Sequence, residues 1–262
     1  FSSSAAAQTP RDSIAFATAQ WRTANLGGGA ECRYAQIDMF GSRQSISVAT
    51  YPGRRFTTSI VHLDRRAEST SDLGKAAGAE IAVNGSYFNV KTFVLLDRKI
   101  VGRTTPEEAF RTNGVIAFKD RKGRRMEIFP CDTTQYADVA RRYRSALAAG
   151  PVLIDGGKVV EYTSGSSFYT RRHPRTLIGK RADGTVVMAV IDGRFKGQGD
   201  GATIAETAYI ARQLGLTEAL NLDGGGSSTL FTTIALGMTL SVSRQNDEQS
   251  HDTPRSESIY EK

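Results

Sequence analysis

Two aspartates stand where apolar segments of the chain end, and glycine follows each of them. Asp192 comes after the continuous apolar run 186–191, and Asp223 comes after the short segment 218–222. An uninterrupted apolar run is typical of a strand that is buried on both faces. A carboxylate at the end of such a strand can act as a general acid, a general base or a nucleophile. Asp192 and Asp223 are therefore candidates for catalysis.

Glu206 is a third candidate carboxylate, and it has a structural alternative. Residues 203–206, Thr-Ile-Ala-Glu, match a capping box, in which the glutamate bonds back to the start of its helix. That geometry also leaves the carboxylate in the first helical turn, facing a site formed with Asp192 and Asp223. Carboxylates that share an anionic site repel one another, which raises the pKa of one and suits it to act as an acid.

A run of glycines and serines follows Asp223 directly. Its members are Gly224, Gly225, Gly226, Ser227 and Ser228. Glycines permit positive φ and a close approach, so the backbone N–H groups of this run can surround a phosphate. The run lacks the lysine of a P-loop, which argues against nucleotide binding.

Polar and cationic residues complete the candidate binding set. Asn84 and Tyr87 follow the short strand-like segment 79–83 and suit a sugar, although a turn with aromatics folded into the core gives the same pattern. Arg175 begins a predicted strand, where it serves either as an anion clamp or in a structural salt bridge. Arg194 follows the Asp-Gly pair that starts at Asp192. The three histidines of the chain show no metal-ligand spacing.

The elements that position these residues are mostly strands joined by short turns. We predict strands over residues 34–39, 44–49, 79–83, 92–96, 115–118, 125–129, 151–154, 158–161, 175–180, 185–191 and 218–222. Helices are predicted over 71–78, 134–147 and 203–214. The predicted class is therefore mixed α/β (α+β), with a mixed sheet core, many hairpins and few helices.

The helix 203–214 and the strands on either side of it form one strand–helix–strand unit. If its two strands are parallel neighbours, Asp192, the helix N-terminus and Asp223 meet at one sheet edge. Ligands of open α/β sheets bind beyond the carboxyl ends of strands, and a helix N-terminus there favours an anion.

Other glycine-containing turns have strand-like sequence on both sides and need no function. Residues 155–157 and 183–184 are predicted hairpin turns. The basic run 121–125 surrounds Gly123 in the same way, so we interpret it as a solvated hairpin tip rather than a nucleic-acid patch.

Composition limits the classes of protein that remain. The chain has 262 residues, 39% of them hydrophobic, and a net charge of 34 − 27 = +7. These values exclude a disordered chain, and no stretch approaches the ~20 apolar residues of a membrane span. The positive charge favours an anionic partner. The arginine pairs are scattered without a recognisable module, so we expect no nucleic-acid binding.

The ends of the chain and its cysteines bear on organisation and location. We expect residues 1–12 to be a mobile leader remnant, the tail from Gln245 to be mobile, and residues 13–262 to form one domain. The Ser/Ala-rich start without a methionine predicts an exported protein. Cys32 and Cys131 pair if the protein is exported or stay apart as buried thiols, and we favour the buried thiols.

Four motifs, in this order, resemble those of the phosphodiester glycosidase family. They are residues 84–88 (Asn-Gly-Ser-Tyr-Phe), 173–179 (His-Pro-Arg-Thr-Leu-Ile-Gly), 192–194 (Asp-Gly-Arg) and 219–229 (Ala-Leu-Asn-Leu-Asp-Gly-Gly-Gly-Ser-Ser-Thr). The resemblance covers about residues 79–242, and the last motif is long and specific. Ser86 stands where the family has a second glycine. Residues 243–245 and 255–257 replace an Asn-Arg-Pro segment and an Arg-Pro pair, which bears on the substrate more than on the chemistry.

The resemblance implies hydrolysis of a sugar-1-phosphodiester, in which a phosphate monoester leaves from C1 of the sugar. Asp223, Glu206 and Asp192 would supply the carboxylates, and the arginines and the glycine run would bind the phosphate. The chemistry requires no cofactor, and Asp192 is where a divalent cation would bind if one is used. The resemblance also implies a bacterial protein of the periplasm or cell surface that acts on an anionic, phosphodiester-linked glycan of the cell envelope. The alternative is a non-catalytic binder of such a glycan on the same fold.

Overall fold

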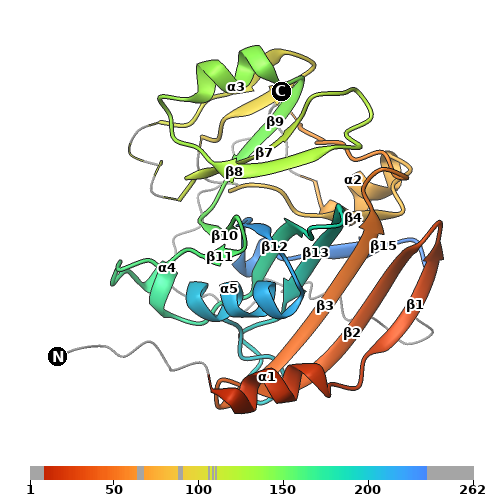
Figure 1. Ribbon diagram of the computed structural model, residues 1–262, viewed down its shortest axis with the longest axis vertical. Helices are drawn as coiled ribbons and strands as arrows, with labels where there is room; N and C mark the ends of the chain where they lie inside the picture. The colour runs from red at the N-terminus through yellow and green to blue at the C-terminus, as the bar shows by residue number, and fades with distance from the viewer. Residues whose placement is uncertain are drawn as a thin grey trace, which may run out of the picture.

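The computed structural model describes residues 9–63, 68–87, 91–105, 107, 109 and 111–234. Figure 1 shows two main sheets stacked face to face, with helices on their outer faces. Sheets dominate and the described α-helices are few, so the predicted α+β class is confirmed. No helix in the described ranges is long and apolar enough to cross a membrane.

The larger sheet has eight strands, and its neighbouring strands are antiparallel throughout. In spatial order they are β1 (Arg22–Gly27), β2 (Ala30–Met39), β3 (Ser42–Pro52), β13 (Thr185–Ile191), β12 (Arg175–Lys180), β14 (Glu218–Asn221), β10 (Val152–Asp155) and β11 (Lys158–Val159). The predicted hairpin turns at 155–157 and 183–184 are confirmed. Their glycines, Gly156, Gly157 and Gly184, all adopt positive φ.

The second sheet has five strands, and a two-stranded sheet lies beside the larger one. The five strands are β6 (Lys99–Gly102), β5 (Val94–Leu96), β9 (Ser145–Ala149), β7 (Gly114–Phe118) and β8 (Met126–Pro130). The small sheet pairs β4 (Ile81–Val83) with β15 (Leu230–Thr232). The basic run 121–125 joins β7 to β8, which confirms that it is a hairpin tip.

Helices cover the outer faces of both large sheets (Figure 1). Helices α1 (Pro10–Ala17), α4 (Ser167–Thr170) and α5 (Ile204–Gln213) lie on the eight-stranded sheet, α3 (Tyr136–Arg142) lies on the five-stranded sheet, and α2 (Thr70–Ala76) packs against β4 and β15.

Apolar clusters hold these layers together. Ile210 of α5 packs with Leu177 and Val187 on the helix-covered face of the larger sheet. On the opposite face, Met188 packs with Phe118 of the second sheet. Fully burying one such side chain contributes roughly 1.5–3 kcal/mol, so the stacked layers fix the ends of the central strands firmly.

The register of the central strands brings the candidate carboxylates to one edge. Strand β12 lies between β13 and β14, with Arg175 opposite Ile191 and Leu177 opposite Asn221. Strands β13 and β14 therefore run in the same direction but are not neighbours, unlike the parallel pair that the sequence suggested. Two strand spacings place their ends about 10 Å apart. Asp192 and Asp223 follow those ends on either side of the start of β12.

Two segments differ from the sequence-based expectation. Helix α1 begins at Pro10, inside the segment expected to be mobile, and Asp12 is buried within it. The predicted helix 134–147 ends at Arg142, and residues 145–149 form the strand β9 instead. These last residues are mainly alanine, a strong helix former, but they pair with β5 and β7 inside the second sheet. Tertiary pairing has overridden local propensity.

The cysteines lie in different apolar clusters. Cys32 packs near β15, and Cys131 packs beneath α3. Both are free and buried, which confirms the interpretation as separate thiols.

Candidate functional site

Asp223 lies in a loop that hydrogen bonds fix from two sides. Its amide donates to the carbonyl of Gly85 at 3.0 Å, and its own carbonyl accepts from the Asn84 side chain at 2.8 Å. The oxygen of the same side-chain amide, Asn84 Oδ1, accepts from Thr176 Oγ1 at 2.7 Å and from the Thr229 amide at 3.0 Å. Asn84 therefore joins the end of β4 to β12 and to the Asp223 loop. These contacts position the Asp223 loop, and binding of a sugar by Asn84 stays a prediction.

The glycine run is bonded within the chain. The Gly224 amide donates to Asp223 Oδ1 at 2.8 Å, and the Gly225 amide donates to the Pro174 carbonyl at 3.0 Å. Ser227 and Ser228 donate to carbonyls inside the same short turn. The predicted phosphate cradle thus has most of its N–H groups directed to the chain itself.

Close approach explains why glycine occupies these positions. A Cβ on Gly224 would lie 2.6 Å from the Pro174 carbonyl oxygen. Gly225 has φ +63°, and a Cβ there would lie 3.1 Å from a guanidinium nitrogen of Arg194. Arg194 itself has φ +68°, a conformation that non-glycine residues seldom adopt. The glycine run therefore admits the Pro174 backbone and the Arg194 side chain. Gly226 is exposed beside them.

Tyr87 is almost completely buried, and its hydroxyl is bonded. The hydroxyl donates to the Gly150 carbonyl and accepts from the Asn221 side chain at 3.4 Å. Burial raises the pKa of Tyr87 far above its usual value, and the charge of Asp223 acts in the same direction. The phenol is therefore protonated at neutral pH and lies close enough to Asp223 to respond to its charge. Phe88, next to it in the motif, is outside the described residues.

Arg175 binds the protein backbone. Its guanidinium donates to the carbonyls of Ala202 at 2.9 Å, Phe168 at 2.6 Å and Arg171 at 3.3 Å. The residue is only 2% exposed, and this burial lowers its pKa to about 10. Arg175 therefore fixes the start of β12 to the loops around it, and its predicted role as an anion clamp is left without support from these contacts.

Asp192 is buried at the end of β13 and held by β3. Its carboxylate accepts a 2.6 Å hydrogen bond from Ser45 Oγ, and its amide donates to the Ser45 carbonyl at 2.9 Å. Within the described ranges, no group of three or more His, Cys, Asp and Glu side chains is placed to hold a metal ion. A divalent cation beside Asp192 stays a prediction.

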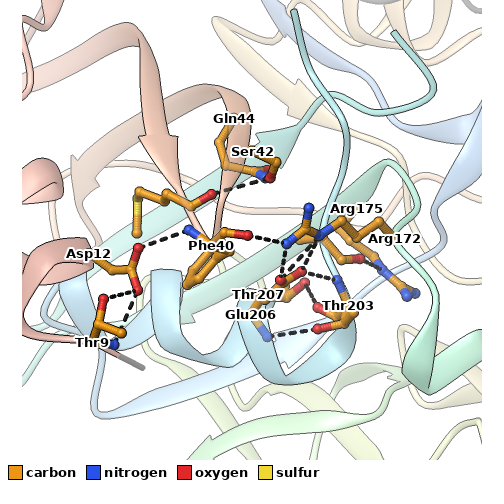
Figure 2. Close-up of polar contacts among 12 residues, drawn as sticks. Thr9, Asp12, Phe40, Ser42, Gln44, Arg172, Arg175, Thr203, Glu206 and Thr207 are labelled. Carbon is orange, nitrogen blue, oxygen red and sulfur yellow. Dashed lines mark hydrogen bonds and ion pairs between the residues drawn. The ribbon is translucent and has the colours of Figure 1, made fainter. Parts of the chain in front are cut away.

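Glu206 belongs to a polar network at the start of α5, which Figure 2 shows in close-up. Its carboxylate accepts from the Thr203 amide at 2.9 Å, which completes the predicted capping box. It also accepts from Arg172 Nη2 at 2.6 Å and from Arg172 Nε at 3.1 Å. Arg172 Nη2 also donates to the Phe40 carbonyl, and the Phe40 amide donates to the Asp12 carboxylate of α1. The helix N-terminus that we expected to bind an anion is therefore already occupied by the chain's own carboxylate.

Arg111, Phe168 and Asn221 are not among the site residues predicted from the sequence. The guanidinium carbon of Arg111 lies 5.3 Å from the ring centre of Phe168 and 6.0 Å from that of Tyr87. Asn221 donates to Tyr87 and to Gly150, and it belongs to the 219–229 motif, which was a usable signal. Arg111 and Phe168 lie in segments without a motif, and only the tertiary structure brings them to Tyr87.

Comparisons with known proteins identify the family to which this chain belongs. The model of the family described as phosphodiester glycosidase matches residues 77–258, slightly more than the 79–242 of the sequence resemblance. The match covers more than two thirds of the chain. The chain belongs to the phosphodiester glycosidase family.

Solved structures share the fold at low sequence identity. The catalytic domain of zebrafish N-acetylglucosamine-1-phosphodiester alpha-N-acetylglucosaminidase, auto-inhibited by its pro-peptide, superimposes with a TM-score of 0.59 and 17% identity over 82% of this chain and 78% of that one. A hypothetical protein from Synechocystis gives 0.57 and 15%, over 81% of this chain and 59% of that one. A putative exported protein from Burkholderia pseudomallei K96243 gives 0.54 and 16%, over 73% and 70%.

One curated relative matches over a short segment. The uncharacterised SPbeta prophage-derived protein YomE of Bacillus subtilis (strain 168) is 42% identical over 57 residues, which are 22% of this chain and 9% of that protein. This chain therefore matches less than a tenth of the length of YomE.

Proposed function

We propose that this protein is a hydrolase that cleaves a sugar-1-phosphodiester at the bond between C1 of the sugar and the phosphate oxygen. The observation that carries the proposal is the fixed position of Asp223 just after β14, where its charge acts on the buried Tyr87 and where the Arg194 side chain packs against Gly225 of the glycine run that follows. Membership of the phosphodiester glycosidase family supports the reaction class.

The reaction has little need of a general acid to protonate the leaving group. The C1–O bond breaks with its electrons moving to the phosphate oxygen, and water supplies the oxygen that bonds to C1. The products are the free sugar and a phosphate monoester, which is a far better leaving group than a sugar alkoxide. The protein must then supply a carboxylate at C1 or at the attacking water, together with cations for the phosphate. Asp223 is the carboxylate that we assign to this role.

Asp192 is the second carboxylate in the proposal, and Glu206 is assigned to the helix cap. Inverting glycosidases keep their carboxyl groups ~6.5–9.5 Å apart to admit a water molecule. Strands β13 and β14 end about 10 Å apart, because β12 lies between them. Proton NMR of the first-formed sugar anomer would distinguish direct attack by water, which inverts C1, from a covalent intermediate, which retains its configuration.

The central experiment measures release of free sugar from a sugar-1-phosphodiester. Asp223→Asn should reduce turnover by about 10²–10⁴-fold, the range for a positioned acid–base group, and leave the melting temperature nearly unchanged. Asp155→Asn is the matched control, because Asp155 also precedes two glycines but lies exposed in the β10–β11 turn. Full activity in Asp223→Asn would contradict the assignment. Tight binding of the wild type to the phosphodiester without sugar release would favour the non-catalytic glycan binder.

We also propose that the protein acts outside the cytoplasm on a phosphodiester-linked glycan of the cell envelope. The similarity to a putative exported protein and the sequence pI of about 9.5 support this location, because a basic protein concentrates at a polyanionic polymer. Fractionation of cells that express the full-length gene product would test it. Recovery only in the cytoplasm would contradict the proposal.

A further inference from the structure

A large cavity lies between the two stacked sheets. Its volume is 1160 Å³, slightly above the ~300–1,000 Å³ of most ligand pockets. Its walls come from the larger sheet, the five-stranded sheet and the short strand β4, and they include Ile81, Val83, Val94, Ile116, Ile178 and Met188. Because these side chains are apolar, the cavity suits an apolar ligand.

Apolar side chains around this cavity stay open to solvent. Ile81 and Val83 pack against the core clusters but are only half-buried. Val61, Ile100 and Val101 line the cavity and are 49%, 36% and 46% exposed. They are three of the six large apolar side chains that are exposed within the described ranges. Apolar surface that gathers at the opening of a hollow is typical of a binding site.

One end of the cavity is formed by the loop that fixes Asp223. Asn84 and Gly85 line the cavity, and they hold the Asp223 backbone through hydrogen bonds of 2.8 and 3.0 Å. Leu222, the residue before Asp223, lines it as well. A substrate that reacts at Asp223 can therefore extend into the cavity.

The charges around the cavity favour an anion at this end. The charged lining residues are Lys91, Arg103, Glu68 and Glu80. Lys91 precedes Thr92, whose hydroxyl lies 3.4 Å from that of Ser86 in the loop next to Asp223. Glu80 precedes β4 and Asn84 follows it, so this carboxylate lies about 13 Å along β4 from the loop. A phosphate is therefore favoured near Lys91.

We propose that the cavity holds the hydrocarbon chain of a lipid-linked substrate, in which a long-chain apolar alcohol and the sugar are esterified to the same phosphate. This inference rests on the proposed function. A phosphodiester carries two ester-linked groups, and the cavity takes the one that leaves with the phosphate. The sugar then reacts at Asp223, the phosphate lies toward Lys91, and the chain extends between the sheets. The products are the free sugar and the monophosphate of the apolar alcohol.

The first test measures binding of ethyl, hexyl and decyl phosphate by titration calorimetry, at concentrations below those at which they aggregate. Each methylene that enters the cavity should tighten binding about fourfold, the equivalent of ~0.8 kcal/mol. Decyl phosphate should therefore bind at least about 100-fold more tightly than ethyl phosphate. Equal affinities for the three phosphates would overturn the inference.

Two substitutions test where the chain binds. Ile81→Trp fills part of the cavity, and Val101→Glu places a charge at its opening. Each should weaken binding of decyl phosphate by about 10-fold or more and leave that of ethyl phosphate within about twofold. Because Val101 is exposed, Val101→Glu keeps the test valid if Ile81→Trp fails to fold. Ile14→Glu is the matched control, since Ile14 is 61% exposed on α1 and does not line the cavity. Unchanged affinity for decyl phosphate in folded Val101→Glu would contradict the inference.

Sugar release separates this inference from the proposed function. For sugar-1-phosphodiesters of ethanol and of decanol, KM should be lower for the decyl ester, and Val101→Glu should raise KM for that ester alone. Sugar release from both esters at the same KM would overturn the inference and leave the proposed function standing. Tighter binding of longer alkyl phosphates without sugar release from either ester would refute the proposed function and leave the cavity as the binding site of a phosphate-linked chain.

Discussion

The first turn of α5 and the loop after β14 each carry an acidic residue that the sequence marked as catalytic, yet the two regions are built differently. At α5, the Glu206 carboxylate accepts hydrogen bonds from Thr203 and Arg172, and the network continues into α1. After β14, two side-chain oxygens near Asp223 have no hydrogen-bond partner among the described residues. They are Asn221 Oδ1 and Ser228 Oγ, both almost completely buried.

This difference distinguishes an acidic residue that stabilises the fold from one that can act on a ligand. A carboxylate whose hydrogen bonds are supplied by the fold stabilises the fold and has little capacity left for a ligand. Buried polar oxygens without partners are uncommon in folded proteins and mark places where water or a ligand completes the structure. The loop after β14 is therefore the better candidate site, and Glu206 has the capping role that the sequence offered as its alternative.

The largest effect on stability should come from Glu206. Glu206→Gln would leave Arg172 partly buried without its ion pair, and we expect a loss of about 2–3 kcal/mol in the free energy of unfolding, discounted because Arg172 is partly exposed. Turnover per folded molecule should stay near that of the wild type. Urea unfolding and the sugar-release assay measure the two quantities. A large loss of turnover at full stability would reverse the roles of the two regions.

A smaller effect is expected at Gly224. Gly224→Ala places a methyl group 2.6 Å from the Pro174 carbonyl oxygen, so the loop must shift. Overpacking of this kind costs about 1–3 kcal/mol, and the shift should also lower turnover, because Gly224 bonds directly to the Asp223 carboxylate. Thermal unfolding and the sugar-release assay are the measurements. Gly165→Ala is the control, since a Cβ there meets nothing within 4 Å. Equal behaviour of the two variants would remove the packing explanation for the glycine run.

The sequence predicted the central strands and the turns between them because their signals are local. The run 186–191 is apolar throughout, and the turn glycines adopt the positive φ that glycine allows. The capping box at Thr203 is also a local pattern, and it is present as predicted. These features need no knowledge of distant neighbours.

The parts that sequence reasoning missed depend on distant neighbours. Nothing between residues 186 and 222 indicates that β12 would lie between β13 and β14 and separate the two aspartates. The Ala-rich strand β9 is a strand only because β5 and β7 pair with it. Arg111 and Tyr87 lie in separate segments that only the tertiary structure brings together. Residues 243–245 and 255–257, which the resemblance marked as departures from the family pattern, lie outside the described residues.

The smallest effect is expected for the two thiols, Cys32 and Cys131. Both are buried and have no assigned role in the site, so they show the effect of burial alone. Burial raises the pKa of Cys32 from 9.0 to about 11 and that of Cys131 from 9.0 to about 12. Both thiols should therefore resist alkylation in the folded protein at pH 8. Two free thiols should appear only in denaturant.

The same shifts give stability a defined pH dependence. The unfolded chain ionises its thiols above pH 9, whereas the folded protein keeps them protonated until about pH 11–12. The stability contributed by the protonated thiols is thus complete below pH 9 and falls as pH rises through that window. Because one pKa unit corresponds to about 1.4 kcal/mol, the expected loss is on the order of 1–2 kcal/mol per thiol by pH 10–10.5.

Urea unfolding of the wild type and of Cys32→Ala between pH 8 and 10.5 measures this loss of stability. The variant should lose less stability than the wild type across this range. If the free energies of unfolding of the wild type and of Cys32→Ala fall in parallel with pH, burial of the Cys32 thiol does not cause the pH dependence.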